Sequence, residues 1–154
     1  GIPAIYIHSI LGTTNDYESL KLTNNKRSIN RKSWQYEEID KLLTDPNSQN
    51  YKIYKELIKL IEIRKNQSAF HPNATQFTFN LGKNFFGIWR QSLDKKQSIF
   101  CVTNVTDVFQ YLDLSELNLI GSNEWWDLIS NEIIIDLKST ISLKAYQTVW
   151  ITNY

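Results

Sequence analysis

The side chains best suited to chemistry gather in one polar stretch, residues 22–31, which reads LTNNKRSINR. Arg27, Asn30 and Arg31 carry donors that suit sugar hydroxyls, and an arginine can also hold a phosphate through two parallel N–H···O bonds. On composition alone, a solvated polar loop explains these residues better than a binding site does. Their role therefore depends on the elements that position them.

Carboxylates are a second group of candidates. Glycoside chemistry needs one carboxyl group as acid and another as nucleophile or base, held at a fixed separation across the sugar. Nothing in the sequence fixes such a pair. Charge on a solvated surface explains each acidic residue of this region, namely Asp16, Glu18, Glu37, Glu38 and Asp40.

Metal, nucleophile and aromatic sites have weaker support. The two histidines, His8 and His71, lie far apart, and Cys101 falls in the apolar run SIFCV, which favours a small buried core residue over a ligand. A Cys–His nucleophile pair stays open as a minor alternative. Trp125 and Trp126 could stack on sugars, but neighbours in a strand point to opposite faces, so one is predicted to enter the core. No metal and no cofactor is predicted.

The elements that position these residues differ along the chain. Residues 1–12 begin with the apolar run GIPAIYI, which predicts a strand buried on both faces, as in a parallel sheet, closed by Gly12. Such a strand needs neighbours that the chain does not offer, so the removal of upstream residues is expected. Residues 13–46 are polar and too long for a routine connection, which is typical of a functional or disordered loop. A short helix, capped by its first residue, is predicted within them over 33–43.

An amphipathic helix is predicted over 48–67. Its apolar residues recur at the spacing of one helix face, which favours packing on a core over binding at a membrane surface; they are Tyr54, Leu57, Ile58 and Ile61.

From Ala74 the apolar pattern changes to a period of two, which predicts strands. A turn at 82–84 joins the first two into a hairpin, and turn-forming residues separate the others. Regular short strands of this kind indicate an antiparallel sandwich or a related β domain. The expected strands are 76–81, 85–90, 97–102, 109–114, 133–135, 138–143 and 148–152.

Charge and composition exclude several classes of partner. Lys and Arg number 17 against 16 Asp and Glu, with no basic block to bind phosphates in a row, so nucleic acid is not an expected partner. No apolar stretch reaches the roughly 18 residues that span a bilayer, so no membrane is expected either. The single cysteine excludes a disulfide framework and fits a reducing compartment, so a cytoplasmic location is expected.

Several of these segments resemble one enzyme family. The run GIPAIY is similar to the eighth barrel strand of the α-amylase superfamily, glycoside hydrolase family 13. The loop that follows is similar to the corresponding loop of the sucrose phosphorylase branch of that family; the similar residues are ND at 15–16, TNN at 23–25, Arg27 and INR at 29–31. The segment IRKNQSAF resembles the last barrel helix, and EWWDLIS with ISLKAYQTVW resembles the terminal β domain.

The resemblance implies an α+β fragment. Residues 1–72 would be the last βα unit of a (β/α)8 barrel, with 13–46 as its active-site loop and 48–67 as its last helix. Residues 73–154 would be an all-β antiparallel sandwich. In a barrel a loop such as 13–46 follows the carboxyl end of a strand, where barrel enzymes place their active sites.

The resemblance also implies an activity. The intact enzyme would transfer a glucosyl unit from an α-glucoside such as sucrose to phosphate with retention of configuration. The family's aspartate nucleophile, glutamate acid/base and transition-state-stabilising aspartate come from earlier strands. All catalytic residues would therefore precede Gly1, and the fragment alone is expected to be inactive.

Four residues are carried over as substrate-binding candidates. Arg31 is expected to touch the glucosyl group and Asn30 to shape the same loop, while Arg27 and Asp16 would order the loop or contact the acceptor. Where the family has His-Tyr-Tyr after the arginine, this chain has Lys-Ser-Trp at 32–34. The acceptor therefore stays open among fructose, phosphorylated fructose, glycerate and glycerol.

Two other functions remain open. A hydrolase or transglucosylase of the same superfamily would share these motifs and differ in its use of phosphate. A non-catalytic carbohydrate-binding or interaction module would use the tryptophan pair and the β domain alone. Sugar and inorganic phosphate are the expected partners, and apolar surface on 1–12 and 48–67 is expected to favour self-association.

Overall fold

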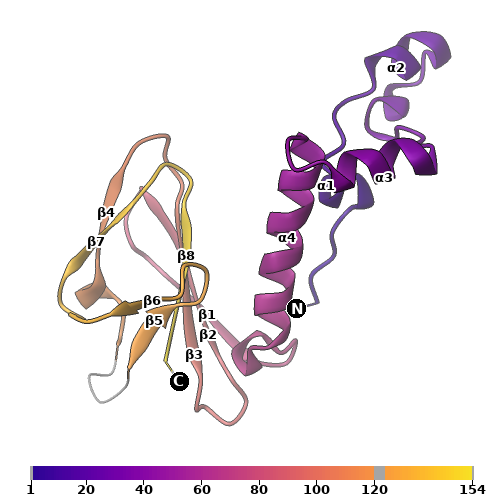
Figure 1. Ribbon diagram of the computed structural model, residues 1–154. Helices are drawn as coiled ribbons and strands as arrows, with labels where there is room; N and C mark the ends of the chain where they lie inside the picture. The colour runs from indigo at the N-terminus through magenta and orange to yellow at the C-terminus, as the bar shows by residue number, and fades with distance from the viewer. Residues whose placement is uncertain (1, 120–123, 154) are drawn as a thin grey trace. The chain divides into compact units, whose positions relative to one another are not determined.

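The structure is a computed structural model that describes residues 2–119 and 124–153. The chain divides into two compact units, which are described separately (Figure 1). Residues 2–62 form the helical unit, and the β unit begins at Ile63. The longest helix, α4 (Gln49–Lys65), spans the division. Among the described residues no helix is long and apolar enough to cross a membrane.

The predicted first strand is wrong for the residues that the structure describes. Residues 2–6 lie outside any strand, and helix α1 covers Ile7–Ile10; Gly1 is outside the described residues. The described strands pair only in antiparallel fashion, so no parallel neighbour meets this segment, and Ile2, Ile5 and Ile7 are exposed. Without neighbours a doubly buried strand has neither hydrogen-bond partners nor cover.

Gly12 ends this first segment, but it follows the short helix α1 and not the predicted strand. Its backbone has φ of +62°, and a Cβ atom placed there would lie 3.0 Å from the side chain of Ile53. The Asn50 side chain donates hydrogen bonds to the carbonyls of Leu11 at 2.7 Å and Gly12 at 3.2 Å. The start of the helical unit is therefore tied to α4.

Residues 13–46 are more ordered than the sequence predicts. They contain α2 (Tyr17–Thr23), the 3-10 helix η1 (Lys26–Asn30) and α3 (Tyr36–Thr44). The cap expected at Ser33 is absent from this helix, because α3 begins three positions later after Gln35, whose side chain makes no capping bond. The helix predicted over 48–67 is confirmed as α4.

The β unit holds two antiparallel sheets. In the described residues the large sheet has the order β1-β2-β3-β8-β5-β6 and the small sheet pairs β4 with β7. The seven predicted strands are all present, shifted by at most two residues at either end. A short 3-10 helix, η2 (Ser68–Phe70), precedes them and another, η3 (Leu114–Glu116), follows β4. The strands are β1 (Thr75–Phe79), β2 (Phe85–Gln91), β3 (Ser98–Asn104), β4 (Gln110–Asp113), β5 (Trp125–Asp127), β6 (Glu132–Ile134), β7 (Thr140–Leu143) and β8 (Thr148–Asn153).

Strand β5 is the strand that sequence reasoning left out. It contains the tryptophan pair, and its pleat turns the two side chains to opposite faces. Trp125 is 1% exposed and enters the core, whereas Trp126 is half-buried. The prediction that one of the pair is a core residue is confirmed.

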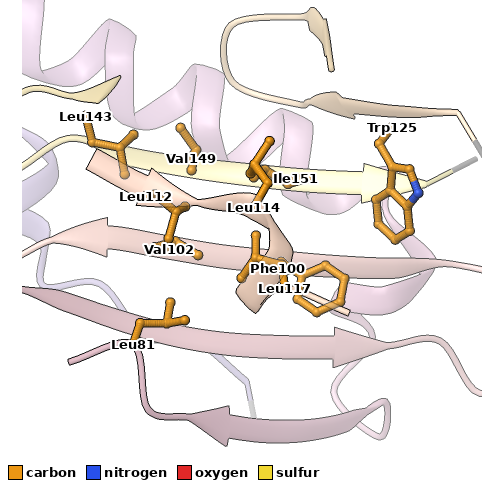
Figure 2. Packing of buried hydrophobic residues seen from close by; sticks show 10 residues of the cluster. All are labelled: Leu81, Phe100, Val102, Leu112, Leu114, Leu117, Trp125, Leu143, Val149 and Ile151. Carbon is orange, nitrogen blue, oxygen red and sulfur yellow. The ribbon is translucent and has the colours of Figure 1, made fainter. Parts of the chain in front are cut away.

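The main core lies between the two sheets (Figure 2). Side chains from β3 and β8 of the large sheet point toward side chains from β4, η3 and β7. Phe100 packs against both Trp89 and Trp125, with ring centroids 5.5 Å and 5.7 Å away. The buried members of this cluster are Leu81, Phe100, Val102, Leu112, Leu114, Leu117, Trp125, Leu143, Val149 and Ile151.

A second cluster covers part of the opposite face of the large sheet. Ala69 and Phe70 from η2 pack there against Ile99 and Cys101. The buried Arg90 ties η2 to the sheet, because its guanidinium donates to the carbonyl of Ala69 at 3.1 Å and to that of His71 at 2.6 Å. Residues 68–71 thus belong to the β unit in this structure, although they precede the predicted boundary at 72/73.

The buried Cys101 allows a test of this packing. Burial raises the pKa of its thiol to about 12, so at pH 8 only about one thiol in ten thousand is the reactive thiolate. We expect thiol reagents to label native Cys101 orders of magnitude more slowly than the urea-unfolded chain. Labelling at comparable rates in the two states would contradict the burial.

Candidate functional site

Asp16 starts helix α2 and is held by its own turn. Its carboxylate accepts the Ser19 backbone N–H at 2.9 Å and the Ser19 hydroxyl at 2.7 Å. These bonds, the backbone N–H first, lower the pKa of Asp16 below its ordinary value. The carboxylate therefore serves as an N-cap, which is a local structural role.

The TNN pattern at 23–25 forms the turn between α2 and η1. Asn24 adopts a left-handed conformation with φ of 52° and ends α2, a position that asparagine tolerates well. Asn25 caps η1 by accepting the Arg27 N–H at 3.0 Å on its side chain. Thr23 and Ser28 meet across the turn through their hydroxyls at 3.1 Å. Each residue of the pattern thus has a conformational task.

The ends of this segment meet. The Asp16 N–H donates to the Ile29 carbonyl at 2.7 Å, which brings the start of α2 beside the end of η1. Arg31 follows as the C-cap of η1, with its N–H bonded to the Ser28 carbonyl at 3.1 Å. The hydrogen bonds that hold Arg27 and Arg31 involve main-chain N–H groups, and both side chains are exposed.

A polar recess of about 240 Å³ lies beside this segment. The Tyr6 hydroxyl donates to the Asn30 carbonyl at 3.0 Å, and His8 Nδ1 lies 3.2 Å from the Thr13 hydroxyl. The same hydroxyl accepts the Trp34 indole N–H at 3.0 Å. The lining of the recess consists of Tyr6, His8, Ser9, Thr13, Thr14, Asn15 and Asn30.

Sequence reasoning missed most of this recess. Of the four predicted site residues only Asn30 lines it, while Asp16 lines a neighbouring recess of about 600 Å³ with Lys32. Arg27 and Arg31 are in the lining of neither. The available signal was the polar triad at 13–15 and the hydroxyl and imidazole of Tyr6 and His8, which the strand prediction had assigned to a buried sheet.

Lys32 and Trp34 form a further polar–aromatic pair. The Lys32 ammonium lies 3.6 Å from the centre of the Trp34 ring and 3.0 Å from a Glu38 carboxylate oxygen. Glu37 and Glu38 occupy the first turn of α3, where the helix dipole favours negative charge. In the described residues no cluster of three His, Cys, Asp or Glu is close enough to hold a metal ion.

Comparison with known proteins identifies the family. No protein-family model matches the chain. Over 98% of its length, however, it is 34% identical to the glucosylglycerate phosphorylase of Escherichia coli strain K12, of which it covers 25%. It is also 31% identical, over 65% of its length and 19% of the relative, to the sucrose 6(F)-phosphate phosphorylase of Thermoanaerobacterium thermosaccharolyticum. The chain belongs to glycoside hydrolase family 13, and these relatives in that family are phosphorylases.

The chain also resembles solved structures in its fold. The chain superimposes on AmyP in complex with maltose with a TM-score of 0.60 at 14% identity, over 74% of the chain and 23% of that structure. This likeness concerns the fold alone. The chain spans about a quarter of the length of the phosphorylases that it matches, and corresponds to their carboxyl-terminal part.

The cap at Asp16 of this family 13 chain can be tested directly. Asp16→Ala removes both bonds to Ser19, so the Ser19 amide should exchange faster with solvent, whereas Asp16→Asn should keep most of the protection because asparagine caps well. With a lowered pKa in the folded state, the carboxylate's contribution is present above the unfolded-state pKa and disappears as the pH falls through the folded-state pKa. NMR hydrogen exchange measures the protection of the Ser19 amide in each variant and at each pH. An unchanged exchange rate of this amide in Asp16→Ala would contradict the capping role.

Proposed function

We propose that this chain is part of a glycoside phosphorylase that transfers a glucosyl unit from glucosylglycerate to phosphate with retention of configuration. The observation that carries the proposal is the 34% identity to a glucosylglycerate phosphorylase over nearly the whole chain. A second such enzyme, from Allomeiothermus silvanus, is 32% identical over 99% of the chain. Sucrose and sucrose 6F-phosphate are then the competing donors to test.

In this proposal residues 1–72 complete a (β/α)8 barrel once the earlier elements of the longer polypeptide supply the neighbours that the run at 2–6 lacks in this structure, and residues 73–154 form a sandwich domain. Two features of the helical unit support the first part. No residue of α4 is buried, and Ile2, Ile5 and Tyr6 are about half exposed or more. Apolar surface of this kind is suited to contact with further elements of a longer polypeptide. The acid, base and nucleophile of the reaction would lie in those elements.

The loop 13–46 then contributes to the donor site. Arg31 binds the glucosyl group, and Asn30 shapes the loop through its carbonyl bond to Tyr6. The Arg31 guanidinium is exposed. Two main-chain hydrogen bonds, Asp16–Ile29 and Ser28–Arg31, hold the backbone from which it extends. An exposed side chain on a fixed backbone suits a group that becomes ordered by its ligand.

Replacing Arg31 tests this role in the longer polypeptide. Arg31→Ala should lower kcat/KM by about 100-fold and Arg31→Lys by about tenfold, because lysine keeps the charge but loses the planar fork. Lys26→Ala, which removes an exposed cation from the 3-10 helix that Arg31 follows, should change kcat/KM less than about twofold. Steady-state kinetics measure these values, and equal losses in Arg31→Ala and Lys26→Ala would contradict a specific contact.

The donor assignment needs a separate experiment. The longer polypeptide that contains this chain is assayed for glucose 1-phosphate release from glucosylglycerate, sucrose and sucrose 6F-phosphate, with and without inorganic phosphate. The proposal expects fastest release from glucosylglycerate, and none from the 154-residue chain alone. If the polypeptide instead releases free glucose, at the same rate with and without inorganic phosphate, it is a hydrolase.

A further inference from the structure

The β unit is open along one side, between β6 and β7. A cleft of about 400 Å³ lies there, and β8 forms its floor. Ile134 from β6 and Val149 and Ile151 from β8 line it, together with Leu143 from β7. Leu143 and Ile151 also belong to the buried core between the two sheets. The cleft therefore borders the core, whose residues Leu143 and Ile151 are themselves almost fully covered.

Both strands beside the cleft are edge strands. Within the described residues, β6 ends the large sheet and β7 is one of the two strands of the small sheet (Figure 1). The N–H of Leu128, just after β5, donates to the carbonyl of Trp150 in β8. Backbone groups alternate in direction along paired strands, so in the β5–β6 register the N–H of Ile133 points away from β5. Ile133 is 72% exposed and Ile135 is 95% exposed. Such edges normally carry lysine or proline, or are covered, because they pair readily with other strands.

The charges at this edge are negative. Glu132 and Asp136 flank the three isoleucines and are exposed, and no Lys or Arg lines the described cleft. The third carboxylate, of Asp127, is engaged by main-chain N–H groups of Ser130 at 3.1 Å and Trp150 at 2.7 Å. The edge thus presents apolar side chains, backbone hydrogen-bonding groups and two exposed carboxylates.

A second copy of this chain does not complement such an edge. Antiparallel pairing of 132–136 with the same residues of another copy, centred on Ile134, would set each Glu132 against an Asp136. Like charges placed directly opposite each other destabilise a strand pair. A segment with lysine or arginine at those positions would instead be attracted.

We propose that the cleft binds an extended segment of another protein, which pairs with the outer edge of β6. One of its alternate side chains is apolar and enters the cleft above Val149 and Ile151. Lysine or arginine two residues before and two residues after it, on the same face of the segment, lies opposite Glu132 and Asp136. This is strand addition, in which main-chain bonds supply affinity and alternate side chains supply specificity.

Synthetic peptides test the proposal with the 154-residue chain. A peptide with a central valine and a lysine two residues before and two residues after it (Lys-Thr-Val-Thr-Lys) should bind, and its twin with glutamate in place of both lysines should not. A third peptide with the first composition but a central proline controls for unspecific attraction. NMR shifts on binding should map to 132–136 and 140–143.

Variants then separate charge from backbone pairing. Glu132→Lys combined with Asp136→Asn should weaken the lysine peptide about tenfold and strengthen the glutamate peptide; asparagine keeps the Asp136 side-chain bond to the Lys138 N–H. Ile133→Pro removes an outward N–H and should weaken the lysine peptide in the same way, while circular dichroism checks that both variants fold.

Several results would overturn the proposal. Equal binding of the two charged peptides, binding of the proline peptide, or shifts that map elsewhere would remove its basis. Self-association that Ile133→Pro abolishes would assign the edge to a second copy. If the longer polypeptide protects 132–136 from hydrogen exchange and does not bind the lysine peptide, the edge is occupied by its own chain, not by another protein. None of these results depends on phosphorylase activity.

Discussion

Trp125→Ala is expected to lower the free energy of unfolding of the β unit by about 3–5 kcal/mol, the range for truncating a large buried aromatic side chain. Trp125 is 1% exposed and contacts Phe100 at 5.7 Å between ring centroids. Its removal leaves a cavity where β5 joins the core (Figure 2). Urea unfolding followed by far-UV circular dichroism measures the change.

The neighbouring Trp126 provides a matched control. It has the same chemistry and the same strand, but its half-buried side chain lies on the opposite face. Trp126→Ala should therefore cost clearly less than Trp125→Ala. Equal losses for the two variants would mean that the pleat does not separate a core face from an outer face here.

The second large effect is expected at Asn104, whose side chain is fully buried at the end of β3. Its amide NH2 lies within hydrogen-bond distance of the carbonyls of Val108 at 2.8 Å, Lys144 at 2.8 Å and Leu143 at 3.2 Å. Its side-chain oxygen accepts the N–H of Thr106 at 2.9 Å. The Asn104 side chain thus links the end of β3 to the segment before β4 and to the end of β7.

Asn104→Leu removes these bonds and leaves the buried carbonyls and N–H unpaired, which should cost about 3 kcal/mol in the free energy of unfolding. Asn104→Asp keeps the acceptor but places a carboxylate against three carbonyls, so it should be no better tolerated. The exposed Asn118→Leu should change the unfolding free energy by less than about 0.5 kcal/mol. Urea unfolding measures all three, and an Asn104→Asp variant of wild-type stability would show that the donors are dispensable.

Sequence reasoning succeeded where the pattern is local. The period-two alternation at 76–81 and 85–90 predicts the β1–β2 hairpin, because side chains of one sheet face must share polarity. The helical spacing of Tyr54, Leu57, Ile58 and Ile61 predicts α4 in the same way. In both cases neighbouring residues suffice to define the element.

It failed where the outcome depends on distant partners. The run at 2–6 has the composition of a buried strand, but no described strand is available to pair with it in parallel. The short β5 has too few residues for a periodic signal, and β8 and β6 supply its pairing. The polar recess depends on the meeting of Tyr6 and Asn30, which lie far apart in sequence. The binding role of the segment 22–31 stays a prediction, and the sequence pattern does not give the orientation of the Arg27 and Arg31 side chains.

The bond from the Asp16 N–H to the Ile29 carbonyl has a consequence for how this loop can evolve. It closes the segment at its base, so residues between the two ends can be inserted or deleted while Asn30 and Arg31 keep their starting position. The entropic cost of a longer closed loop rises only slowly, by about 0.6 kcal/mol for each doubling of length. Variation in length near the left-handed Asn24 turn could therefore diversify what the loop recognises, at little cost to the stability of the rest of the helical unit.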